Sequence, residues 1–138
     1  MGKSIRDAMT SNPRGVGKST TVVEAARLMK SEDVGSLPVV EGERLVGMVT
    51  DRDIVLRVVA EGKDANASTV GEVASSDLVT IDPQQDLDEA LRLMAQHQVR
   101  RLPVVEEDGR LVGILAQADV AQTGDDKKTG QVVQEISE

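Results

Sequence analysis

The sequence is two copies of one unit of about sixty residues, and this internal repeat limits the fold more than any other feature. Residues 5–40 align with residues 70–105 at a constant offset of 65. One inserted residue then raises the offset to 66, which places Asp53 opposite Asp119. Because a single gap suffices over some fifty positions, the two copies are expected to share one fold.

Each copy predicts the same order of elements. A short helix is followed by an extended segment around Val16 or Val79, a long helix, two strands and a closing helix from Asp51 or Gln117. The first and last residues of each predicted helix and strand follow from apolar residues at helical or strand spacing. The predicted ranges are 5–9, 21–30, 37–40 and 45–50 in the first copy and 70–73, 86–96, 102–105 and 111–115 in the second. The N-caps are expected at Thr20 and at Gln85–Asp86.

Composition narrows the possible functions. The 138 residues include no Cys, Phe, Trp or Tyr, so the core must be aliphatic and disulfides or thiolate sites are excluded. The net charge of −8 argues against nucleic acid as a partner, because phosphate binding needs a basic surface. No apolar run has the ~18 residues that a membrane span needs. With no hydrophobic signal region at the N-terminus, a cytoplasmic protein is expected.

Residues 15–20, Gly-Val-Gly-Lys-Ser-Thr, resemble the end of a phosphate-binding loop. The full motif needs a glycine five residues before the Gly-Lys pair, and Asn12 stands there. No buried strand precedes the segment, and the repeat places Lys18 opposite Pro83 in an ordinary turn. A nucleotide hydrolase is therefore not predicted.

Other catalytic or metal chemistry is not indicated either. His97 is the single histidine, so no two-histidine metal site can form, and its place at a helix end fits a capping or solvated role. The acidic pairs 51/53 and 125/126 are explained by helix starts or surface positions. We expect no enzyme and no metal site.

Thr50 and Asp53 stand at the start of the first closing helix, three residues apart, so both side chains can face one cleft. Free backbone N–H groups at such a start favour an anion. A hydroxyl beside a carboxylate also suits the two hydroxyls of a ribose. The alternative is a capping box that serves the helix alone.

Arg100 and Arg101 precede the buried strand of the second copy and are placed to hold a phosphate. A solvated pair of surface arginines is the alternative. The first copy has the uncharged Gly35 and Ser36 at these positions.

With these features in hand, the sequence resembles a tandem pair of CBS domains, also called a Bateman module. The resemblance rests on the order of short motifs in both copies and covers about residues 4–122. In the first copy they are Met9-Thr10, Pro13, residues 21–29, Leu37-Pro38-Val39-Val40 and residues 45–53; in the second they are residues 79–83, 99–105 and 113–119.

The resemblance implies an α/β (α+β) fold of two βαββα repeats packed with pseudo-two-fold symmetry. The repeats would span residues 4–60 and 70–122, joined by a linker at 61–69. A polar tail at 123–138 would either dock as a short C-terminal helix or fray. The resemblance also implies a disc-like homodimer, a regulatory role without catalysis, and an unknown protein partner that reads the ligand state.

The resemblance further implies a ligand, an adenine nucleotide (AMP, ADP or ATP) or S-adenosylmethionine. Thr50 and Asp53 would hold ribose, Arg100 and Arg101 phosphate, and Val79-Thr80-Ile81 adenine, with Val49 and Arg52 alongside. A second cleft would be weak or empty, because Ala116 replaces the hydroxyl beside Asp119. Its other residues would be Gly35, Ser36 and Val16. A scaffold or stress protein that binds no ligand is the rival function.

Overall fold

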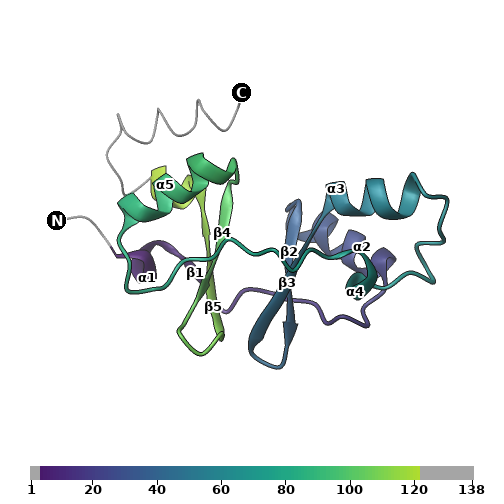
Figure 1. Cartoon of the computed structure of the whole chain (residues 1–138), viewed down its shortest axis with the longest axis horizontal. Helices are drawn as coiled ribbons and strands as arrows, with labels where there is room; N and C mark the ends of the chain where they lie inside the picture. Colours follow the sequence, from purple (N-terminus) through teal and green to yellow (C-terminus); the bar gives the residue numbers. More distant parts are fainter. Residues whose placement is uncertain (1–3, 122–138) are drawn as a thin grey trace. The chain divides into compact units, whose positions relative to one another are not determined.

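The computed structural model describes residues 4–121, in two compact units. Unit 2 is the continuous segment Arg14–Leu78, and unit 1 combines Met1–Pro13 with Val79–Glu138. The predicted tail at 123–138 lies outside the described residues. The mixed α/β fold expected from the repeat is confirmed, since both units contain a small antiparallel sheet with helices (Figure 1).

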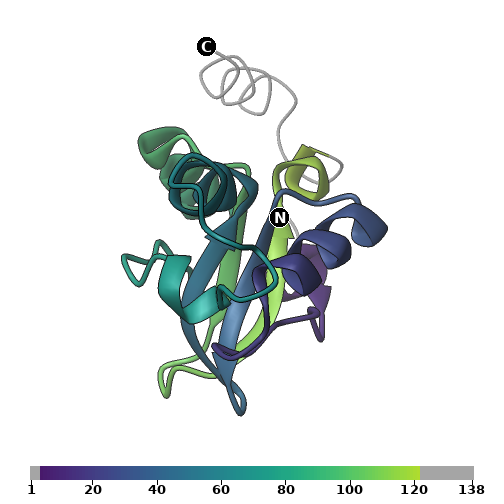
Figure 2. The same ribbon diagram turned by 90° about the vertical axis from the view of Figure 1, so that its right-hand side faces the viewer.

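Unit 2 is built around the hairpin of β2 (Ser36–Glu41) and β3 (Arg44–Thr50). Its helices are α2 (Val22–Glu32), α3 (Asp51–Ile54) with the π-helix η1 (Val55–Val59), and α4 (Val70–Val73). Figures 1 and 2 show the hairpin turn at the end of the strands away from α3. The aliphatic core includes Val22, Val39, Val49, Val58 and Val70.

Unit 1 repeats this plan with β4 (Arg101–Val105) and β5 (Leu111–Ala116), flanked by α5 (Leu87–His97) and α6 (Gln117–Ala121). The start of the chain adds α1 (Ile5–Ala8) and β1 (Thr10–Ser11). Ile5 is fully buried in a core with Met94, Leu102 and Leu115.

The ends of the long helices follow from their terminal residues. The side chains of Thr21 and Asp86 cap α2 and α5 by accepting from backbone N–H groups three residues on. For α5 the cap is the second of the two expected residues, Gln85 and Asp86, whereas Thr20 was wrong by one residue for α2. Thr20 instead accepts from Gly17 N at 3.2 Å within the preceding turn.

The opening segment of each sequence copy packs against the strands of the other copy. β1 pairs with β5 in unit 1, with Thr10 opposite Ile114. In unit 2, the backbones of Ser75 and Met48 exchange hydrogen bonds of 2.9 Å. The structural units are therefore offset from the sequence repeat by one opening segment.

Candidate functional site

Thr50 and Asp53 form a reciprocal capping box at the start of α3. The Thr50 Oγ1 atom accepts from Asp53 N at 3.0 Å, and Thr50 N donates to Asp53 Oδ2 at 2.9 Å. Both residues are half-buried. The capping role considered from the sequence is therefore present. It leaves the Thr50 hydroxyl hydrogen and the second Asp53 carboxylate oxygen outside the box.

The neighbours of this box in unit 2 come from the start of β2. Ser36 pairs with Thr50, and Asp51 N donates to Gly35 O at 2.9 Å. A Cβ atom at Gly35 would lie 3.1 Å from Asp51 Oδ2, so glycine leaves room for this carboxylate. Unit 2 thus brings the box together with the uncharged Gly35 and Ser36.

Two other predicted residues of this region differ in accessibility. Val49 is fully buried in the unit 2 core, so its side chain supports the strand and faces no ligand. Arg52 is exposed at the start of α3.

Unit 1 carries only half of the equivalent box. Ala116 N donates to Asp119 Oδ2 at 3.2 Å, but Ala116 has no hydroxyl to return the contact. Arg101 pairs with Ala116, and Gln117 N donates to Arg100 O at 2.7 Å. The two arginines therefore lie beside the incomplete box, in the same unit.

Arg100 and Arg101 differ from the other basic residues of unit 1. The described part of this unit contains five arginines and no lysine, and Arg6, Arg92 and Arg110 each form an ion pair with a glutamate. Within these residues neither Arg100 nor Arg101 has an anionic partner. Arg101 is half-buried and Arg100 is exposed, so both positive charges are available to an anionic ligand.

In the extended segment at residues 79–81, the backbone of Ile81 already forms hydrogen bonds with β4. Ile81 N donates to Pro103 O at 3.0 Å, Val105 N donates to Ile81 O at 2.9 Å, and the Ile81 side chain is buried. Only the half-buried Val79 and Thr80 keep backbone groups that could face an adenine. Val16 makes the matching bonds to Pro38 and Val40 in unit 2, so its counterpart is Ile81 and not Val79.

Sequence reasoning missed Gln117, the residue after Ala116. Its Nε2 atom is buried and has no hydrogen-bond partner among the described residues. The sequence signal that could have found it is its alignment with Asp51 of the first copy at the offset of 66. In unit 2 the Asp51 side chain lies against Gly35.

The rejected phosphate-binding loop is an ordinary turn. Lys18 forms an ion pair of 3.2 Å with Glu41, and α2 begins only at Val22. His97 is an exposed residue in the last turn of α5. Residues 4–121 contain no group of three or more metal-ligating side chains. Among them there is also no helix long and apolar enough to cross a bilayer.

Two similar units, each with a hairpin leading into a helix whose start is supported by an aspartate, define a duplicated α/β module. A family model for the CBS domain matches twice, at residues 5–60 and 70–124, and the chain belongs to this family as a tandem CBS-domain pair.

Two bacterial proteins are similar over most of the chain. The CBS domain-containing protein YhcV of Bacillus subtilis is 49% identical over 118 residues, which cover 86% of this chain and 83% of YhcV. Hypoxic response protein 1 of Mycobacterium tuberculosis is 43% identical over 118 residues, which cover 85% of this chain and 82% of that protein. Both relatives are thus little longer than the pair itself.

Two solved structures share the fold. The crystal structure of Hypoxic Response Protein I with two coordinated zinc ions matches with a TM-score of 0.79 at 42% identity, covering 87% of this chain and 98% of that one. The structure of CBSX2 in complex with AMP matches with a TM-score of 0.75 at 30% identity, covering 88% and 95%.

Proposed function

We propose that this CBS pair is a regulatory module that binds an adenine nucleotide. Thr50 and Asp53 of unit 2 would contact the ribose, Arg100 and Arg101 of unit 1 the phosphate, and the backbone of Val79 and Thr80 the adenine. The observation that carries the proposal is that Arg100 and Arg101 lack an ion partner while the other three described arginines of unit 1 have one.

The asymmetry of the two copies supports one ligand per chain. The complete capping box lies at Thr50, and the free arginines lie at 100 and 101. The complementary set, Ala116 with Gly35 and Ser36, offers neither a hydroxyl at the box nor a positive charge. The AMP complex of CBSX2, a protein of the same fold, makes an adenine nucleotide the first ligand to test.

A regulatory role fits the rest of the molecule better than catalysis. The polar groups of the candidate site belong to helix caps and strand ends, and no nucleophile is paired with a base there. We further propose that the chain acts as a homodimer whose ligand state is read by a partner protein.

The test is isothermal titration of the full chain with AMP, ADP, ATP and S-adenosylmethionine. We expect one site per chain for at least one of the nucleotides. Thr50→Ala, which gives the first copy the residue that the second copy already has, should weaken this binding, whereas Ala116→Ser should leave it unchanged. Absence of heat with all four compounds would refute the proposal and favour a scaffold that binds no ligand.

A further inference from the structure

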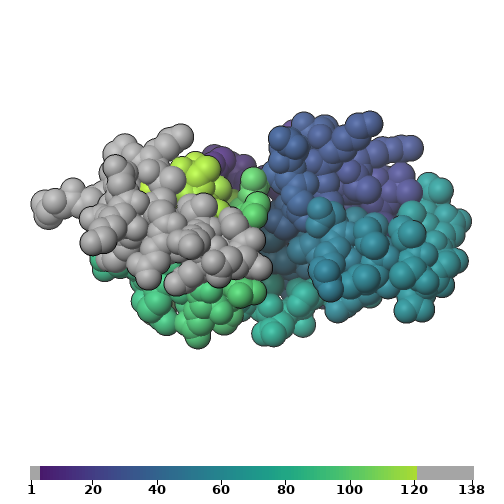
Figure 3. Space-filling model, turned by 90° about the horizontal axis from the view of Figure 1, so that it is seen from above, coloured from purple at the N-terminus to yellow at the C-terminus, as the bar shows by residue number. Residues whose placement is uncertain are grey.

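The first opening segment, residues 4–11, is held to unit 1 by few apolar side chains. Ile5 is fully buried, and Ala8 and Met9 are partly buried against the same core. β1 has only two residues, and both are exposed. Purple atoms of this segment reach the visible surface of unit 1 in Figure 3. An element this short depends on its apolar anchors for its place in the unit.

The sulfur atom of Met9 lies against Gly113 in β5. A Cβ atom added at Gly113 would lie 2.9 Å from Met9 Cγ and closer still to Met9 Sδ. The same point is 3.0 Å from Thr10 O, so a backbone carbonyl oxygen is also a neighbour of the sulfur. A thioether suits this contact because it is apolar and adaptable in shape.

The equivalent contact in unit 2 contains no sulfur. At the offset of 65, Met9 aligns with Ala74, whose methyl group lies 3.7 Å from the Cβ position of Gly47. The fold therefore accepts a small and inert side chain at this contact, and the thioether is a separate property of unit 1.

Met9 differs from the other three methionines of residues 4–121 because it is both accessible and packed on a core. Met29 and Met94 are 6% and 0% exposed, so an oxidant reaches them poorly. Met48 is half-buried like Met9, but among the described residues it does not belong to the side chains that pack against the unit 2 core. Oxidation at Met9 should therefore have the largest effect on packing.

We propose that Met9 is a modification site for hydrogen peroxide, and that its sulfoxide releases residues 4–11 from unit 1. A sulfur lone pair attacks one oxygen of the peroxide and the O–O bond breaks. Proton transfer to the leaving hydroxide then gives methionine sulfoxide and water. The sulfur is oxidised by two electrons, and the peroxide is reduced.

The sulfoxide oxygen would be a hydrogen-bond acceptor without a donor at this contact. The carbonyl oxygen of Thr10 is itself an acceptor and would repel it, and the core around Ile5 is apolar. Release of the segment would leave β5 as an open edge strand, because β1 is its outer neighbour in the sheet. The proposal does not depend on nucleotide binding, so the two can fail separately.

The first experiment treats the full chain with hydrogen peroxide and maps the products by peptide mass spectrometry. Sulfoxide should form faster at Met9 than at Met29 or Met94. Hydrogen exchange of the oxidised chain should then be about tenfold faster or more across residues 4–11, because local opening costs less without the Met9 contact. Exchange in α2 of unit 2 should not change. Treatment with a methionine sulfoxide reductase should restore the original rate.

Met9→Leu and Met48→Leu are the matched variants, because leucine fills a similar volume and cannot form a sulfoxide. Met9→Leu should keep its slow exchange after peroxide, whereas Met48→Leu should lose protection as the wild-type chain does. Met9→Gln places an amide oxygen near the position of the sulfoxide oxygen. This variant should exchange faster across residues 4–11 without any peroxide.

Three results would each overturn the proposal. Oxidation of Met9 no faster than that of the buried Met29 and Met94 would mean that the site is not accessible. Slow exchange of residues 4–11 in a chain that carries Met9 sulfoxide would mean that the contact tolerates the oxygen. Loss of protection in Met9→Leu after peroxide would place the sensitive group elsewhere.

Discussion

A substitution of Arg101 should lower the affinity for a nucleotide without lowering the affinity for the corresponding nucleoside. It is half-buried at the start of β4 and has no anionic partner among the described residues. If it holds a phosphate, Arg101→Ala removes a charged hydrogen bond worth about 1.5–3 kcal/mol. Calorimetry should then show AMP binding weakened by roughly tenfold to a hundredfold, at 1.4 kcal/mol per factor of ten.

Adenosine is the matched ligand control for this variant, because it lacks the phosphate. Its affinity should change little in Arg101→Ala. Arg110→Ala is the matched protein control, since Arg110 already pairs with Glu106 at 2.7 Å and is not placed at the ligand. An equal loss of adenosine and AMP affinity would contradict the phosphate role of Arg101.

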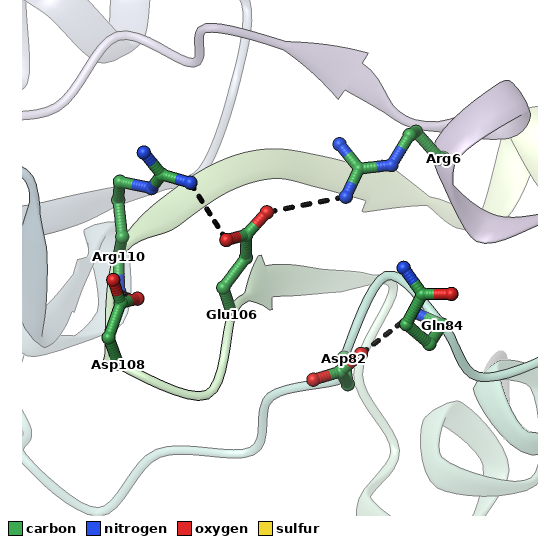
Figure 4. Close-up of polar contacts among 6 residues, drawn as sticks. All are labelled: Arg6, Asp82, Gln84, Glu106, Asp108 and Arg110. Atoms are coloured by element: carbon green, nitrogen blue, oxygen red, sulfur yellow. Dashed lines mark hydrogen bonds and ion pairs between the residues drawn. The ribbon is translucent and has the colours of Figure 1, made fainter.

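Glu106 links the first segment of the chain to the second copy through charge. Arg110 and Arg6 donate to its carboxylate at 2.7 Å and 3.3 Å, as Figure 4 shows. The hydrogen bond from Arg110, followed by that from Arg6, lowers the Glu106 pKa below its usual 4.5. The folded state therefore binds the Glu106 proton less readily than the unfolded chain does.

This pKa shift predicts a dependence of stability on acid. The contribution of Glu106 should be fully present above the ordinary glutamate pKa and should be lost as the pH falls through the lowered one. Glu106→Gln should accordingly be less stable than wild type near pH 7, by a small margin because the pair is exposed. Denaturant unfolding from neutral pH to about pH 3 should show the two proteins converging. A constant difference would contradict the ion-pair explanation.

At the scale of single elements, local signals predicted most of the fold. Apolar residues at helical spacing and the Asp86 cap located α5 at Leu87–His97, within one residue of its predicted limits. The strands were found to a similar accuracy because turns with Gly42 and Gly109 at positive φ separate them. The π-helical turn of η1 was not predicted, since it depends on how Val58 and Arg57 meet the rest of unit 2.

The crossed opening segments could not be read from local pattern either. The residue pattern of 4–11 does not predict which strand β1 pairs with. One signal was present in both copies, the glycine of the Leu-Val-Gly motif. A Cβ atom at Gly47 would lie 3.0 Å from Ser75 O, and one at Gly113 would lie 3.0 Å from Thr10 O and closer still to Met9 Sδ. Each glycine lets the opening segment of the other copy approach its strand.

Gly113→Ala should therefore destabilise the pairing of β1 with β5. The new methyl group would press on Met9 and on the Thr10 carbonyl, an overpacking that typically costs about 1–3 kcal/mol. Chemical unfolding would measure this loss, and hydrogen exchange should show it concentrated at Thr10, Ser11 and their partners. Gly17→Ala is the control, because a Cβ atom there meets nothing within 4 Å. Equal stability of Gly113→Ala and wild type would refute the close-approach explanation.

For the molecule as a whole, duplication predicted the fold, and differences between the copies predicted the candidate site. Residues shared by both copies, such as Leu37 and Leu102, are buried core positions. Residues that differ, such as Thr50 and Ala116, lie at the helix starts where a ligand would be held. The sequence could not show that the backbone of Ile81 pairs with β4. This parallel bridge joins residues 81 and 104, which are far apart in the sequence.

The crossed connection also predicts which fragment of the chain can fold. Residues 14–78 are continuous and include the whole described core of unit 2, with Val70 and Val73 of α4 buried by 100% and 98% of their surface. Residues 4–68, the first sequence copy with all but the last residue of its linker, lack α4 and carry Ile5, which is buried only in unit 1. A domain of this size is marginally stable, so losing part of its core should matter greatly.

We expect fragment 14–78 to unfold cooperatively by circular dichroism and to show dispersed amide resonances. Fragment 4–68, of the same length, should show neither property, because its two buried valines are missing and Ile5 and Met9 are left without their partners. Because the two fragments have the same length and share residues 14–68, a difference in stability would reflect which opening segment each fragment contains. If instead fragment 4–68 were the more stable of the two, the opening segment would pack within its own copy, and the crossed arrangement of α1, β1 and α4 would be wrong.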